Sequence, residues 1–201
     1  MSFGLHYSDT ILGRVFSQAA GPPAGAAIPI YTATAIAGGM PIWNPPGSNR
    51  NVELISVDID YGSGTAVYGP IGLMAGQLNS IATASGCSAF AATTPVSGLL
   101  LAGPASKCMS SNTGTVTVTA GTATPPVAGI PGAGWVRSLA DINLEAATGT
   151  ANITGIHTYV FNGTIIVPPG VLIYLAAGQA SVALYATTII WKEVPVVPNA
   201  G

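Results

Sequence analysis

The 201-residue chain is 49% hydrophobic and only 6% charged, with five Lys or Arg, seven Asp or Glu and a formal net charge of −2. Soluble domains usually carry about 25% charged residues, so we expect copies of the chain or a larger partner to cover much of this surface. The scarcity of basic residues argues against direct binding to nucleic acid. Gly, Pro and polar residues interrupt every apolar run before the roughly 20 residues of a membrane-spanning helix, which argues against insertion into a membrane.

The N-terminal segment is expected to be an arm. It lacks the basic and apolar regions of a secretory signal, which indicates a protein made in the cytoplasm. Residues 10–19 fit a short helix capped by Asp9 or Thr10, or an extended stretch lying on a neighbour. Because Gly21, Pro22 and Pro23 end this stretch, we expect an N-terminal arm over residues 1–45 and a β-sandwich over residues 46–201.

Residues 28–47 contain the first expected strand and a stiff connection. Ile28–Ala37 is rich in β-branched and apolar residues and is typical of a strand. Pro41–Gly47 follows it with three prolines, which predicts a rigid loop. Trp43 in this loop would then be exposed to a partner or cap the sandwich.

The stretch Asn51–Tyr61 alternates with the period of a half-buried strand. One face would carry Ile55, Val57, Ile59 and Tyr61 toward the core, and the other Leu54, Ser56, Asp58 and Asp60. Asp58, Asp60 and Gly62 resemble the start of a calcium loop, but the twelfth loop position is Gly69 instead of Glu. We therefore assign both carboxylates to the solvent face and expect no metal there.

The middle of the chain gives weaker patterns. Thr65–Tyr68 is an expected strand, stopped by Gly69 and Pro70. Residues 71–106 fit a long loop and a buried crossing equally well, with Leu99–Leu101 as their dense apolar element. Strict alternation predicts a strand at Thr115–Ala120 with Val116 and Val118 inward.

Beyond residue 120 the turn signals become stronger. A rigid loop is expected at Gly129–Gly134, ending in Trp135. Ser138–Ala146 fits either a short helix or a strand, whereas Ile153–Phe161 predicts a strand. Asn162 and Gly163 form the dipeptide typical of a tight turn that leads into the closing segment.

The last forty residues predict three consecutive strands. Thr164–Val167 and Val171–Ala176 are separated by Pro168, Pro169 and Gly170, and Ser181–Val194 follows after a turn. In this last strand Val182, Leu184 and Ile190 would lie on one face and Ala183, Tyr185, Ile189 and Trp191 on the other. Such a strand belongs either in the middle of a sandwich or against another subunit. About eight strands in all predict an all-β fold, a jelly-roll-like two-sheet sandwich.

A search for chemistry finds few candidates. His6 and His157 are the two histidines, and they complete neither a catalytic triad nor a metal site. Cys87 and Cys108 are expected to be reduced, partly buried thiols and not a disulfide. We therefore assign no catalytic, cofactor-binding or metal residue and no cofactor. The candidate assembly or packing residues are aromatic and aliphatic: Trp43, Trp135, Tyr185, Ile189 and Trp191.

The sequences GTIIVPPGVLIYLAA and ASVALYATTIIWKEVP, at residues 163–177 and 180–195, resemble the C-terminal strands of the jelly-roll capsid cement or decoration proteins of tailed bacteriophages. The resemblance covers about residues 45 to 201. It implies a non-catalytic structural protein on the capsid surface of a virion, made in the host cytoplasm. The implied form is a homotrimer bound to the major capsid protein over junctions between its subunits.

Two other classes of function fit part of the pattern. A tail-fibre or receptor-binding module of a phage would use the same sandwich, but normally with a polar or aromatic pocket for sugar. An enzyme of cupin-like build needs clustered His and Glu residues that this sequence lacks. The position of the chain in a particle would separate a capsid protein from a tail protein.

Overall fold

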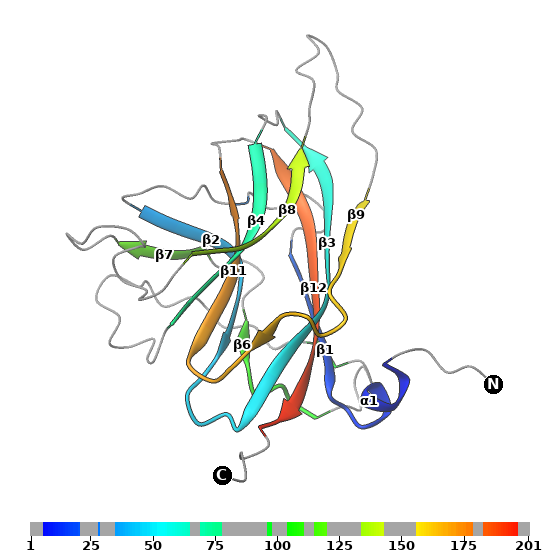
Figure 1. The fold of residues 1–201 in the computed structure, drawn as a ribbon. Coiled ribbons are helices and arrows are strands. Elements are labelled where there is room, and N and C mark those ends of the chain that lie inside the picture. Colours follow the sequence, from blue (N-terminus) through cyan, green and yellow to red (C-terminus); the bar gives the residue numbers. More distant parts are fainter. Residues whose placement is uncertain are drawn as a thin grey trace.

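The computed structural model describes residues 6–20, 28, 35–64, 69–77, 96–97, 104–110, 115–119, 134–142, 156–178 and 183–196. These residues form two antiparallel sheets of six strands each, packed face to face, with one short helix at their lower end (Figure 1). The expected all-β fold with two packed sheets is confirmed.

Sheet A contains β1 (Val15–Ala20), β3 (Arg50–Ser63), β5 (Val96–Ser97), β9 (Ile156–Val160), β10 (Ile166–Val167) and β12 (Leu184–Pro195). Its order is β10-β3-β12-β1-β5, and β9 also pairs with β3. Sheet B contains β2 (Ala35–Asn44), β4 (Gly69–Gln77), β6 (Met109–Ser110), β7 (Thr115–Thr119), β8 (Gly134–Ile142) and β11 (Val171–Ala177). Its order is β6-β2-β11-β4-β8, and β7 also pairs with β2.

The long strands pair in a nested order. The first, β1, pairs with the last, β12, and β2 pairs with the next to last, β11. Further in, β3 pairs with β9 and β10, and β4 pairs with β8. The chain therefore resembles one long antiparallel hairpin that is wound over on itself, with its two arms alternating between the sheets.

Strand β12 is the middle strand of sheet A and alternates as expected. Tyr185, Ile189 and Trp191 are buried in the core between the sheets, whereas Leu184, Thr188 and Ile190 on the opposite face are half-buried. The indole of Trp191 packs against the ring of Phe16 on β1, with 6.2 Å between ring centroids. The predicted core face of this strand is confirmed, and it lies inside the subunit.

A β-bulge changes the predicted faces of β3. Ser56 pairs with Ile190 and Leu54 with Trp191, so Ile55 is an extra residue without a partner on β12. The insertion shifts the alternation by one residue, because side chains alternate with a period of two along a strand. Val52 and Leu54 are consequently buried in the core together with Val57, and the expectation that Ile55 faces the core and Leu54 the solvent is wrong.

Strand β11, in the middle of sheet B, is apolar on both faces, and both are buried. On β11, Ile173 and Leu175 belong to the core between the sheets, whereas Leu172 and Tyr174 are equally buried on the other face. Their neighbours on that other face, Trp43 on β2 and Met74 on β4, are buried too. Burial on both faces explains why β11 reads as a continuous apolar run.

Of the two forms expected for residues 10–19, the short helix is wrong. The helix α1 spans only Tyr7–Ile11, and residues 15–20 form β1 against β12. Gly13, with φ of +66°, ends the helix in a left-handed conformation. The N–H groups of Gly13 and Arg14 donate to the carbonyls of Thr10 and Asp9, which is the pattern of a Schellman motif.

The expected boundary at residue 45 does not separate an arm from the sandwich, because β1 and β2 contribute a strand to each sheet. The strand expected at Ile28–Ala37 lies later in the chain, at Ala35–Asn44, so Pro41–Asn44 is strand and not loop. Trp43 is 8% exposed and therefore buried, so of its two expected positions the exposed one is wrong. Trp43 pairs with Leu172 on β11 and with Met109 on β6, and its burial follows from this place inside sheet B.

Three more strands, β7, β9 and β11, agree with the expected strands. Residues 71–77, expected as a loop or a buried crossing, belong to the buried strand β4. Gly69 and Pro70, expected to follow a strand over residues 65–68, are the first residues of β4. Residues 65–68, 99–101, 129–133 and 143–155 lie outside the described residues, as do the side chains of Val116 and Val118.

The tight turn at Asn162 and Gly163 is confirmed, with positive φ at both residues and a hydrogen bond from Thr164 N to Phe161 O. It does not connect a hairpin, since β9 and β10 both pair with β3, one after the other.

Trp191→Ala should lower the free energy of unfolding by about 3–5 kcal/mol, because the lost burial and the cavity add. Trp191→Phe should cost less, since the indole N–H has no hydrogen-bond partner among the described residues. Denaturant unfolding measures both, with Thr188→Ala, on the half-buried face of the same strand, as control. Equal losses for Trp191→Ala and Thr188→Ala would contradict the assigned core face.

Candidate functional site

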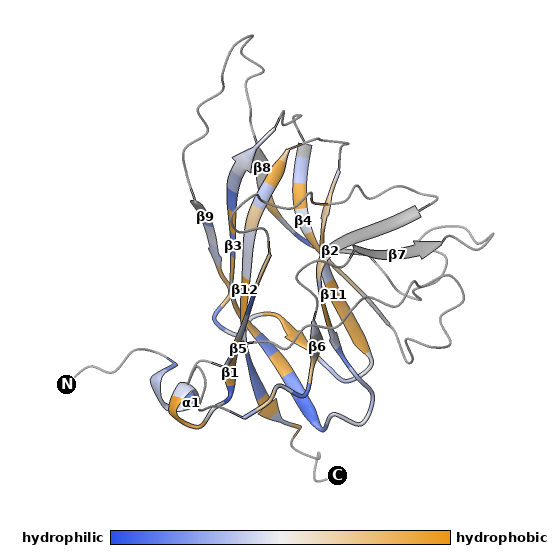
Figure 2. Ribbon diagram, turned by 180° about the vertical axis from the view of Figure 1, so that it is seen from behind, coloured by the Kyte–Doolittle hydropathy of each residue, from blue (hydrophilic) through white to orange (hydrophobic). Residues whose placement is uncertain are grey.

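The charged residues gather at one end of the sandwich. Seven of the twelve Lys, Arg, Asp and Glu residues of the chain meet where α1 lies against the ends of β1, β3 and β12: Asp9, Arg14, Arg50, Glu53, Lys107, Lys192 and Glu193. We call this set the charged end. Figure 2 shows hydrophilic segments around α1 and the lower parts of these strands.

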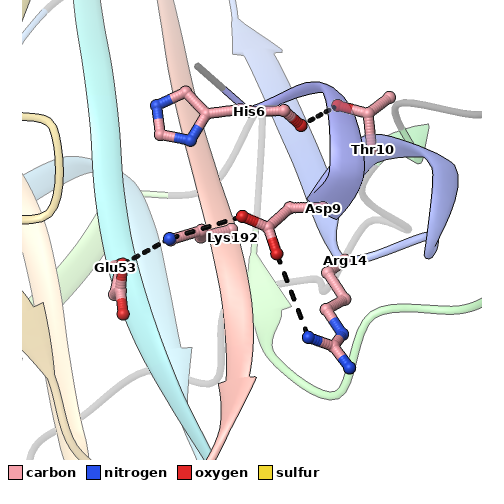
Figure 3. Close-up of polar contacts among 6 residues, drawn as sticks. All are labelled: His6, Asp9, Thr10, Arg14, Glu53 and Lys192. Carbon is pink, nitrogen blue, oxygen red and sulfur yellow. Dashed lines mark hydrogen bonds and ion pairs between the residues drawn. The ribbon is translucent and has the colours of Figure 1, made fainter. Parts of the chain in front are cut away.

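A chain of ion pairs ties α1 to sheet A (Figure 3). Lys192 Nζ lies 2.9 Å from Glu53 Oε2 and 3.4 Å from Asp9 Oδ2, and Asp9 Oδ1 lies 3.9 Å from Arg14 Nη1. The hydrogen bond to Glu53 raises the pKa of Lys192 above its ordinary value. Since every residue of α1 is outside the core, these contacts hold a helix that has little apolar burial of its own.

The Glu193 side chain is buried between the sheets and holds the segment 104–110. Its carboxylate accepts hydrogen bonds from the Ser106 hydroxyl, from Lys107 N at 3.0 Å and from Cys108 N at 3.4 Å. A buried carboxylate is stable only when such donors replace its lost hydration. Glu193 therefore links strand β12 to the chain entering β6.

Two further buried polar groups complete this region. The Asn44 side chain donates to the carbonyls of Arg50 and Val167, at 2.8 and 2.9 Å, and fixes the turn between β2 and β3. Cys108 is a free, buried thiol, as expected; Cys87 lies outside the described residues. Burial raises the pKa of the Cys108 thiol, and the nearby Glu193 carboxylate adds to the rise. The thiol is thus kept protonated, unlike a nucleophilic cysteine.

A pocket of about 270 Å³ opens beside this network. Arg14, Arg50, Lys107 and Glu193 line it together with apolar residues that include Leu12 and Phe16. Three of the five basic residues of the chain therefore face one pocket. Sequence reasoning missed this grouping, because the three residues are far apart in the chain. They are brought together by the pairing of β12 with β1 and β3 and by the hydrogen bond from Lys107 N to Glu193.

The sequence-predicted packing residues do not form part of this pocket. Tyr185, Ile189 and Trp191 line the core of sheet A, where Tyr185 meets Tyr61 edge to face at 6.1 Å. Trp43 lies on the opposite side of sheet B, and the side chain of Trp135 on β8 lies outside the described residues. The structure thus brings three of the five together, inside the subunit.

The other candidates are scattered. His157 is exposed on β9, and His6 precedes α1, where its carbonyl accepts hydrogen bonds from Thr10. Asp58 and Asp60 are half-buried on the face of β3 opposite the core. Among the described residues, no group of three or more His, Cys, Asp or Glu side chains is placed to hold a metal ion.

One signal for the buried carboxylate was present in the sequence. Glu193 follows Ile189 and Trp191 at intervals of two, so the alternation of β12 placed it on the core face. A charged residue in phase with a core face predicts a buried, hydrogen-bonded group. Its partners at residues 106–108 carry no corresponding pattern.

No protein-family model, curated protein or solved structure matches this chain. Within the part of the chain that the structure describes, no helix has the length and apolar character needed to cross a membrane.

Glu193→Ala should lower the free energy of unfolding by about 3 kcal/mol, because the N–H groups of Lys107 and Cys108 lose their acceptor at roughly 1–3 kcal/mol each. Glu53→Ala is the matched control, since it removes a carboxylate whose ion pair is partly exposed and worth about 1 kcal/mol or less. Chemical denaturation of both variants gives the comparison. A loss for Glu193→Ala no larger than that for Glu53→Ala would contradict the role of Glu193 in holding the segment 104–110.

Stability should fall as the pH rises above about 8.5, where the thiol of Cys108 ionises in the unfolded chain but stays protonated in the folded one. The unfolded state then binds fewer protons, and the slope approaches about −1.4 kcal/mol per pH unit. In the Cys108→Ala variant, the free energy of unfolding should fall less steeply between about pH 9 and 10, because the contribution of this thiol is absent. Parallel pH profiles for the two proteins would contradict the raised thiol pKa.

Proposed function

We propose that this chain is a non-catalytic structural protein of a virion, which binds the major capsid protein on the outside of the shell and stabilises it as a cement or decoration protein. The proposed form is a homotrimer of jelly-roll subunits. The observation that carries the proposal is the placement of charge, which is confined to a few positions of a sandwich that is otherwise almost uncharged.

The strand order supports the jelly-roll interpretation. In a jelly roll a long antiparallel hairpin is wound into two sheets, so that outer strands pair with outer and inner with inner. The four nested pairs β1·β12, β2·β11, β3·β9/β10 and β4·β8 follow that arrangement. In this order, β9 and β10 form one edge of sheet A, beside β3.

The surface supports a covered, assembled state. Outside the charged end, the charged side chains that the structure describes are those of Asp58, Asp60 and Arg137. Val160 and Ile166 on the β9 and β10 edge are 57% and 54% exposed. Exposed apolar side chains on an edge strand favour association with another chain, and neighbouring copies in a trimer would cover them.

The decisive experiment is to image purified particles and locate this chain. The proposal predicts density for it over the capsid shell, in trimers at the junctions between subunits. Density confined to the tail would instead support a fibre or receptor-binding module. Sedimentation of the recombinant protein should give a trimer at micromolar concentration, and a stable monomer would contradict the proposed form.

A further inference from the structure

The pocket at the charged end has a surplus of positive charge. Arg14, Arg50 and Lys107 carry three positive charges, and Glu193 is its acidic lining residue. The Glu193 carboxylate is already satisfied by the hydroxyl of Ser106 and by two backbone N–H groups. Across the residues that the structure describes, neither Arg50 nor Lys107 takes part in an ion pair.

Arg14 is only weakly engaged. Its guanidinium lies 3.9 Å from Asp9, whose other oxygen faces Lys192, and its side chain is 39% exposed. Three basic residues therefore line the pocket, and only Arg14 among them has an ion-pair partner within the described part of the chain. Such groups bind carboxylate and phosphate oxygens through short, charge-assisted hydrogen bonds.

An apolar patch continues from the pocket onto helix α1. Tyr7, Ile11 and Leu12 are 47%, 53% and 58% exposed, and Leu12 itself lines the pocket. Tyr7 and Ile11 are four residues apart and lie on the same side of the helix. Tyr7 and Ile11 on one side of α1, and Leu12 at the pocket, are thus exposed apolar side chains close to basic residues, a combination that matches a ligand both acidic and apolar.

We infer that this pocket and the exposed side of α1 form a binding site for an acidic segment of a partner protein, which places carboxylates at Arg14, Arg50 and Lys107 and an apolar side chain against Ile11 and Leu12. A free phosphate would use the basic side chains but not the apolar ones. The partner is a polypeptide because the inference rests on the proposed function, in which the chain binds a protein shell.

Calorimetric titration of the full chain with the capped peptide Glu-Glu-Leu-Glu-Glu tests the site. Binding should be weakened at least about tenfold by Arg50→Gln and by Lys107→Gln, and left unchanged by Arg137→Gln, a basic residue on β8 that contacts the ring of Phe161. Leu12→Ser should weaken binding less. Raising the salt from about 0.01 to 0.15 M should weaken it as well, because the Debye length falls from about 30 to 8 Å.

Several results would overturn the inference. They are undetectable binding of the peptide, equal binding of Gln-Gln-Leu-Gln-Gln, inorganic phosphate binding as tightly as the peptide, and equal losses in Arg137→Gln and Arg50→Gln. Circular dichroism of each variant must match the wild type. Imaging of particles separates the two proposals. If the chain is found on the shell but the peptide does not bind, only the proposed site is wrong. If the peptide binds but the chain is absent from the shell, only the proposed capsid function is wrong.

Discussion

The pairing of β12 with β1 on one side and β3 on the other is the constraint on which the rest of the structure depends. It joins residues about as far apart in the chain as the fold allows, such as Phe16 and Trp191. It also places Glu193 inside the sandwich and Lys192 outside it, next to α1. Strand β12 thus contributes Trp191 to the core, Glu193 to the hydrogen bonds with segment 104–110, and Lys192 to the ion pairs of the charged end.

Alternation of apolar and polar residues with a period of two made part of the fold predictable from the sequence. The faces of β12, the strands at residues 115–119 and 171–177 and the turn at Asn162 and Gly163 followed from local alternation and turn chemistry. The N-terminal strands did not. Residues 10–19 satisfy helical spacing, but Gly13 ends the helix and the tertiary pairing with β12 makes residues 15–20 a strand. Proline at position 41 similarly argued for a loop where sheet B contains a strand.

Two features could not be predicted from the sequence, each for a physical reason. In the fold, a bulge at Ile55 places Leu54 in the core, and alternation alone cannot reveal an inserted residue. The grouping of Arg14, Arg50 and Lys107 in the site depends on the long-range pairing of β12 with β1 and β3 and on the hydrogen bond from Lys107 N to Glu193, to which no local pattern corresponds. At the charged end the few charges therefore have two roles, since Asp9, Glu53, Lys192 and Glu193 hold segments of the chain together while Arg14, Arg50 and Lys107 line the pocket.

Native-state hydrogen exchange of the backbone amides tests the central claim most directly. If β1 is an integral strand of sheet A, the paired amides of residues 15–20 should open with the same free energy as those of β12 and β3, close to that of global unfolding. Exchange of β1 at a much lower free energy, with β3 and β12 still protected, would show that the N-terminal segment is a detachable arm and would contradict the account.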